Sequence, residues 1–110
     1  MFLRSLVLAT FAFGCGSGGT QIPRDRVTSP GDALFNGYTK PDVNCFECHD
    51  GTGHGTSWGP ALAKRVPLRT DDQLTATIRD GKGKMPAFRA KLTDAEIAEL
   101  VTWLRGTFGH

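Results

Sequence analysis

The run Cys45-Phe46-Glu47-Cys48-His49 constrains this chain more than any other stretch of it. On a helical turn, residues at i, i+3 and i+4 lie on one face, so the two cysteines and the histidine would project together. Two thiols and an imidazole on one face are suited to hold a flat ligand against that turn.

This spacing is the attachment signature of c-type haem. In such a site the two thiols form thioethers with the vinyl groups of the porphyrin, and the imidazole takes one axial position on the iron. We therefore predict one covalently bound haem c, with Cys45 and Cys48 binding the porphyrin and His49 binding the iron.

Two other uses of the cysteine pair, in a zinc site or in a redox-active dithiol, fit the sequence less well. A structural zinc site takes four ligands, whereas this chain offers one cysteine pair, and the adjacent positions of Cys48 and His49 are poor geometry for a tetrahedral ion. A thioredoxin-like dithiol belongs at the end of a strand in a βαβ unit, and the surrounding sequence predicts no convincing strand.

Length and charge limit the class of protein. A chain of 110 residues forms one small domain with a limited core, to which a large apolar cofactor would add. Lys and Arg number 13 against 11 Asp and Glu, which indicates neither a nucleic-acid partner nor an acidic disordered tail. Fourteen glycines and six prolines predict long connections between few regular elements.

Residues 1–15 have the pattern of an export signal. Arg4 precedes an apolar run that is too short to span a bilayer and that ends at Cys15, ahead of a Gly/Ser stretch. Cys15 resembles the lipidated first residue of a mature bacterial lipoprotein. Ala12-x-Gly14 would also suit an ordinary signal peptidase, and a buried cysteine in an apolar helix is a third interpretation. Residues 16–28 are polar without an apolar period, which predicts a flexible tether.

Capping residues predict where the helices begin. Ser29 is suited to cap a first short helix, which Asn36-Gly37 should end. A second helix is expected after the capping box Thr70-x-x-Gln73 and should end at Gly81. The glycine-rich residues 50–69 show almost no helical period and are expected to be a long loop that wraps around the haem.

The last helix has the clearest pattern. Thr93-x-x-Glu96 is a capping box, and the apolar residues that follow recur at the i, i+3, i+4, i+7 spacing of a core face. We expect this helix to end at Gly106 and Trp103 to pack in the core.

From about Pro30 to its end, the chain resembles the class I cytochromes c, which are small, all-helical electron carriers with one haem. Gly31 and Phe35 match the Gly-x-x-x-aromatic pattern of the family's first helix. Leu100 and Trp103 match the Leu-x-x-aromatic pattern of its last helix. In that family the two helices cross closely, and the glycine makes room for the crossing.

Two loops carry the rest of the resemblance. Trp58-Gly59-Pro60-Ala61-Leu62 resembles the family's Gly-Pro-x-Leu, whose proline carbonyl accepts the hydrogen bond of the axial imidazole. Gly83-Lys84-Met85-Pro86 resembles the loop that presents the sixth iron ligand, which implies that Met85 binds the iron opposite His49. One departure is Asp50, which stands directly after the histidine where the family often has glycine.

The resemblance implies an all-α cytochrome c fold over residues 29–110, with three to four short helices and long loops around one haem. With His49 and Met85 on both axial positions, the iron has no open site for a substrate. The expected function is therefore one-electron transfer between redox proteins, not catalysis. His54 and His110, the other histidines, are expected to be exposed and not to bind the iron.

The resemblance also predicts where the protein is located, and two other functions stay open. Haem c is attached outside the cytoplasm in the family that this chain resembles, so we expect an exported, periplasmic protein that is anchored to a membrane through a lipid on Cys15. A haem-based gas or redox sensor, in which a ligand displaces Met85, stays open. So does the haem domain of a larger oxidoreductase complex.

Overall fold

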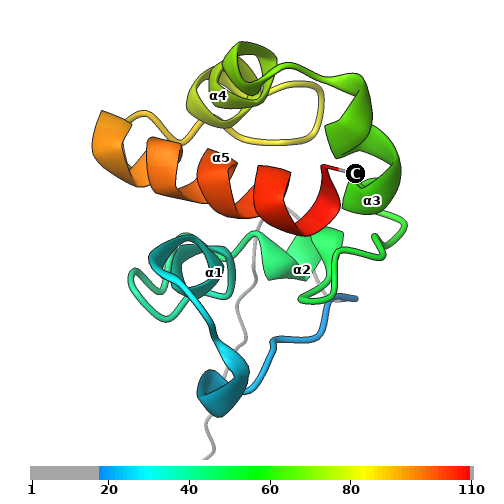
Figure 1. Ribbon diagram of the computed structural model, residues 1–110, viewed down its shortest axis with the longest axis vertical. Helices are drawn as coiled ribbons and strands as arrows, with labels where there is room; N and C mark the ends of the chain where they lie inside the picture. Colours follow the sequence, from blue (N-terminus) through cyan, green and yellow to red (C-terminus); the bar gives the residue numbers. More distant parts are fainter. Residues whose placement is uncertain (1–17, 110) are drawn as a thin grey trace, which may run out of the picture.

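The computed structural model describes residues 18–109, so the predicted export signal with Cys15, and also His110, lie outside the described range. Between residues 18 and 109 the chain forms α-helices and no strand, which confirms the all-α prediction (Figure 1). The elements are η1 (Arg24–Arg26), α1 (Pro30–Phe35), α2 (Phe46–His49), α3 (Leu62–Arg65), η2 (Val66–Leu68), α4 (Asp71–Asp80) and α5 (Asp94–Phe108), where η is a 3-10 helix.

Three of the helices begin where the capping residues predicted. The Ser29 side chain accepts a hydrogen bond from a backbone N–H in the first turn of α1. Thr70 and Gln73 form a capping box at α4, and Thr93 and Glu96 form one at α5. Local sequence chemistry therefore determines these helix starts.

Helix α5 does not end at Gly106 as predicted but continues to Phe108. The Phe108 ring packs edge-on against Trp103, with ring centroids 5.7 Å apart. The Gly109 N–H then donates to the Arg105 carbonyl at 2.9 Å and closes the helix. Glycine inside a helix costs about 1 kcal/mol, and the aromatic contact of Phe108 two residues later offsets that cost.

The crossing of α1 and α5 organises the core. In Figure 1, α5 runs across the centre of the molecule, with α4 on one side and α1 on the other, and α5 contacts both. A Cβ on Gly31 would lie 2.4 Å from the Glu99 carbonyl oxygen, so only glycine allows this approach. The Phe35 and Trp103 rings pack beside it in a tilted contact with centroids 4.9 Å apart, which confirms the crossing that the resemblance implied. The buried core consists of Leu34, Phe35, Val43, Leu62, Val66, Ile78, Phe88, Leu92, Ile97, Leu100, Val101 and Leu104.

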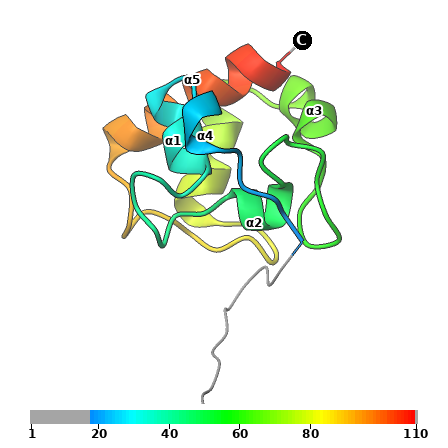
Figure 2. The same ribbon diagram turned by 90° about the horizontal axis from the view of Figure 1, so that it is seen from below.

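The described part of the expected tether lies against the domain. The Thr20 N–H donates to an Asp50 carboxylate oxygen at 2.9 Å, and the Gly51 N–H donates back to the Thr20 carbonyl at 2.8 Å. The Ile22 N–H donates to the side-chain oxygen of the fully buried Asn36 at 2.9 Å. Figure 2 shows this segment passing beside α2 on its way to η1. Residues 18–22 are thus fixed by partners distant in the sequence, which polarity alone did not indicate.

The long connection between α2 and α4 also differs from the expected loop, because α3 and η2 lie at its end. Arg105 of α5 holds η2 and the start of α4: its guanidinium donates to the Val66 carbonyl at 3.1 Å and to the Asp71 carboxylate at 2.9 Å. This partner comes from the far end of the chain, so no local period revealed it. Within residues 18–109, no helix is long and apolar enough to cross a bilayer.

Candidate haem-binding site

The cysteine-histidine run forms the single helical turn α2. Cys45 is its N-cap, and the His49 N–H donates to the Cys45 carbonyl at 3.0 Å. The turn ends at Asp50, whose φ of 66° lies in the left-handed region that favours glycine. Hydrogen bonds from Thr52 lower the pKa of the Asp50 carboxyl, which also accepts from the Thr20 N–H. The departure from the family pattern is therefore accommodated by side-chain hydrogen bonds.

His49 is held in the orientation that an axial ligand needs. Its side chain is buried, at 9% exposure, and its Nδ1 lies 3.0 Å from the Pro60 carbonyl oxygen. A carbonyl only accepts, so Nδ1 carries the proton and the Nε2 lone pair of the neutral ring is left for a metal. Burial lowers the pKa of His49, although the Pro60 hydrogen bond opposes this effect. The ring is consequently neutral at pH 7.

The two cysteines differ in this structure. Cys45 is a free, partly buried thiol that packs against the core, and burial raises its pKa to about 12. Cys48 lies at the contact with residues 56–60, where its carbonyl accepts a hydrogen bond from the Thr56 hydroxyl at 2.7 Å.

Met85 comes from the connection between α4 and α5. Its N–H donates to the Lys82 carbonyl at 2.9 Å and its carbonyl accepts from the Lys82 N–H at 3.0 Å, which closes a tight turn. The Met85 side chain is partly buried and packs against the core, as do Cys45 and Leu74. The Phe35 ring, also in that core, has its centroid 6.4 Å from the His49 ring.

The rival histidine within the described range lies apart from this cluster. His54 is exposed, and its Nδ1 lies against the Thr52 hydroxyl. Sequence reasoning missed two contributors to the site: the backbone of Thr20, which is hydrogen-bonded to Asp50 and Gly51 after α2, and the side chain of Trp58, whose ring lies against Lys84 beside Met85. No pattern pointed to the first, whereas an aromatic residue two positions before Pro60 was a signal for the second.

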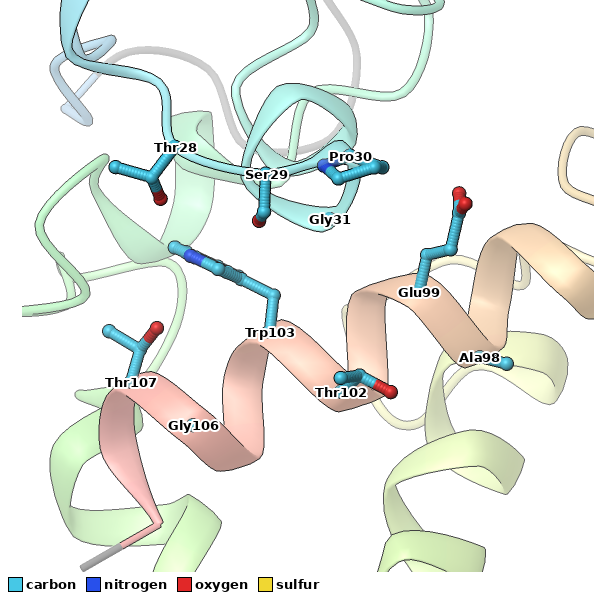
Figure 3. A pocket seen from close by; sticks show the side chains of 10 residues that line it. All are labelled: Thr28, Ser29, Pro30, Gly31, Ala98, Glu99, Thr102, Trp103, Gly106 and Thr107. Atoms are coloured by element: carbon cyan, nitrogen blue, oxygen red, sulfur yellow. The ribbon is translucent and has the colours of Figure 1, made fainter.

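The open groove shown in Figure 3 is a different part of the surface. It has a volume of about 410 Å³ and lies over the crossing of α1 and α5, with the Trp103 indole between the two helices. Its lining contains none of the residues predicted to bind the haem. The groove therefore does not belong to the candidate site.

The residues present fit a haem. Neutral imidazole and thioether sulfur, the groups that His49 and Met85 carry, are both side-chain groups that can bind haem iron. The partly buried apolar side chains of Cys45, Phe46, Leu74 and Met85 suit a porphyrin face. Across residues 18–109, no three His, Cys, Asp or Glu side chains gather to hold a bare metal ion. Iron that already carries porphyrin nitrogens needs only two ligands from the protein.

Comparison with known proteins gives the family. The family model described as "Cytochrome C oxidase, cbb3-type, subunit III" matches residues 28–104, which is well over half of the chain. Cytochrome c6 of Pyropia tenera is 31% identical over 75 residues, which cover 64% of this chain and 88% of that protein. Cytochrome c6 of Parathermosynechococcus lividus is 29% identical over 75 residues, which cover 64% of this chain and 86% of that protein.

A solved structure agrees with the sequence relatives. The KustC0563 c-type cytochrome matches with a TM-score of 0.57 and 25% identity, and the match covers 70% of this chain and 95% of that one. The helical fold, the family match and these relatives lead to one conclusion. The chain belongs to this cytochrome c family and is a small class I c-type cytochrome, with one covalently bound haem c and its iron.

Proposed function

We propose that this protein transfers single electrons through a haem c held by Cys45 and Cys48 and ligated by His49 and Met85. The observation that carries the proposal is the 3.0 Å contact between His49 Nδ1 and the Pro60 carbonyl oxygen. This hydrogen bond fixes both the tautomer and the direction of the imidazole, and it strengthens Nε2 as a ligand. When bound, the haem supplies an iron that cycles between the ferrous and ferric states.

The chain's own residues would make the site a carrier. With His49 and Met85 as its two protein ligands, the iron would have no open position for a substrate, which favours electron transfer over catalysis. A soft thioether favours the ferrous state, and so does a low-dielectric pocket, which disfavours the extra positive charge of ferric haem. The reduction potential is therefore expected to be high relative to that of a haem with two imidazole ligands.

Met85 tests this proposal most directly. The ferric wild type should show the weak near-infrared charge-transfer band of a sulfur-iron bond. Met85→Ala should abolish the band and lower the reduction potential by more than about 59 mV, which is a tenfold change for a one-electron couple. The measurements are a near-infrared spectrum and a redox titration of each protein.

Met85→Leu is the matched control, because leucine has a similar volume but no sulfur. If Met85 binds the iron, Met85→Leu loses the band as Met85→Ala does. A band that survives in either variant would show that another residue is the sixth ligand. A potential that falls only in Met85→Ala would mean that Met85 contributes packing and not ligation.

We also propose that residues 1–15 are an export signal, that a lipid on Cys15 anchors the protein, and that residues 29–110 form the cytochrome domain in the periplasm. The short charged start, the apolar run and the cysteine before Gly/Ser support this. Bacterial lipoproteins carry more than one acyl chain, so anchoring should be firm. Cys15→Ser should move the protein from the membrane to the periplasmic fraction with its haem content unchanged; equal fractionation of both proteins would contradict the anchor.

A second candidate function rests on the description of the matching family, which names an oxidase subunit. The chain would then be a haem subunit within a larger oxidoreductase complex, with neighbouring subunits as electron donor and acceptor. Haem staining after native electrophoresis of gently solubilised membranes distinguishes an independent carrier from a subunit of a complex. A band at the size of the chain supports the carrier, and a band that co-migrates with a large complex supports the subunit.

A further inference from the structure

Residues 56–60 contact both segments that carry the proposed iron ligands, His49 and Met85. The Pro60 carbonyl oxygen lies against His49, as described above. Two residues earlier, the Trp58 ring lies beneath Lys84, whose Nζ is 5.1 Å from the ring centroid. Lys84 directly precedes Met85. One loop therefore supports the histidine by a hydrogen bond and the methionine segment by a cation–π contact.

Hydrogen bonds hold the backbone of Trp58, although 44% of the residue is exposed. Its N–H donates to the Thr56 hydroxyl at 3.0 Å, and that hydroxyl donates to the Cys48 carbonyl at 2.7 Å. The Thr56 N–H donates to the Gly59 carbonyl at 2.9 Å. A Cβ on Gly59 would lie 2.9 Å from the Cys48 carbonyl oxygen, so this loop touches the backbone of α2. The backbone that carries the indole is thus fixed relative to the haem-binding turn.

Lys84 and Met85 belong to the same tight turn. The paired hydrogen bonds between Lys82 and Met85 close a four-residue turn with Lys84 inside it. Gly83, also in this turn, has φ of +59°, and a Cβ there would meet no atom within 4 Å. Lys82, Gly83 and Lys84 are exposed, and the contact between Lys84 and the Trp58 ring joins this turn to residues 56–60.

We propose that Trp58 and Lys84 are positioning residues that hold the Met85 turn beside the haem-binding turn, and so oppose the displacement of Met85 from the iron. This inference rests on the proposed ligation by Met85. An external ligand reaches the iron only after the methionine segment moves, and that movement separates Lys84 from the Trp58 ring. A variant that lacks the contact therefore needs less free energy to move the methionine segment away from the iron.

The test is the affinity of the ferric haem protein for added imidazole. Trp58→Leu and Lys84→Gln should each bind imidazole about two- to fivefold more tightly than the wild type, which corresponds to about 0.5–1 kcal/mol. Lys84→Arg keeps a cation over the ring and should behave as the wild type. Lys82→Gln removes the same charge from the same turn, where no ring contact to Lys82 occurs in the described chain, and should also leave the affinity unchanged.

A double-mutant cycle separates the contact from independent effects of the two side chains. The double variant should bind imidazole no more tightly than the stronger single variant, because each substitution already breaks the same contact. An additive result, or an equal gain for Lys82→Gln, would overturn the proposal. A readout that does not depend on iron ligation is the proton NMR spectrum of the ferrous protein. The Lys84 side-chain methylenes should shift upfield in the Trp58 ring current and lose that shift in Trp58→Leu.

The same samples separate this inference from the proposed function. A wild type without the sulfur-iron band refutes Met85 ligation, and the positioning role falls with it. A wild type that has the band but binds imidazole exactly as tightly as Trp58→Leu and Lys84→Gln retains the proposed function and refutes the positioning role alone.

Discussion

The double variant Cys45→Ala, Cys48→Ala is expected to retain no haem after acid-acetone extraction, whereas the wild type keeps all of it. Without thiols at these positions, no thioether joins the porphyrin to the chain, and the axial bonds do not survive denaturation. The loss should also reduce helicity, because a chain of this size buries a limited apolar core and the haem adds to it. Circular dichroism of the same samples measures this second effect.

Each single cysteine variant is the matched control for the pair. Cys45→Ala or Cys48→Ala leaves one thioether and should keep haem through the extraction, at a lower yield than the wild type. Haem that extracts freely from the wild type would refute covalent attachment by these residues.

The second large effect is expected at Gly31, where α1 crosses α5. A Cβ there would lie 2.4 Å from the Glu99 carbonyl oxygen and 2.6 Å from the Trp103 Cβ. Both neighbours are fixed, one as backbone of α5 and the other as the first side-chain atom, so the helices must separate. Gly31→Ala should lower the free energy of unfolding by about 3 kcal/mol, and Gly31→Val by more. For a domain of this size, 3 kcal/mol lowers Tm by about 12–24 °C.

Gly106→Ala is the control for Gly31→Ala. It adds the same methyl group on α5, where a Cβ would meet no atom within 4 Å. Because alanine is the better helix former, this variant should be more stable than the wild type by about 0.5–1 kcal/mol. Thermal unfolding followed by circular dichroism compares the two. Equal Tm values for Gly31→Ala and Gly106→Ala would show that the close crossing is absent in solution.

Separating α1 from α5 should also change the surroundings of His49 in the haem site. Phe35 follows Gly31 by one turn and packs against Trp103, and its ring centroid is 6.4 Å from that of His49. A shift of α1 therefore moves an aromatic neighbour of the proposed axial ligand. The near-infrared band of Gly31→Ala should weaken at a lower temperature than that of the wild type, in step with its lower Tm.

The sequence by itself determined the features that depend on neighbours within a few residues. Thr70 and Thr93 predicted the starts of α4 and α5, since a capping box is complete within four residues. The spacing of Cys45, Cys48 and His49 predicted one helical turn with its ligands together, and α2 is that turn. The resemblance of Pro60 to a family motif also anticipated its hydrogen bond with His49.

Only the tertiary structure decided the features whose partners are distant in the chain. Residues 18–22 look like a tether because their apolar content is low, but their backbone groups find partners at Asn36, Asp50 and Gly51. Helix α5 passes Gly106 because Phe108 meets Trp103, and η2 is held by Arg105. The Trp58–Lys84 contact joins two loops that no local period relates. Local propensity is summed over one turn, whereas these outcomes depend on which surfaces the folded core brings together.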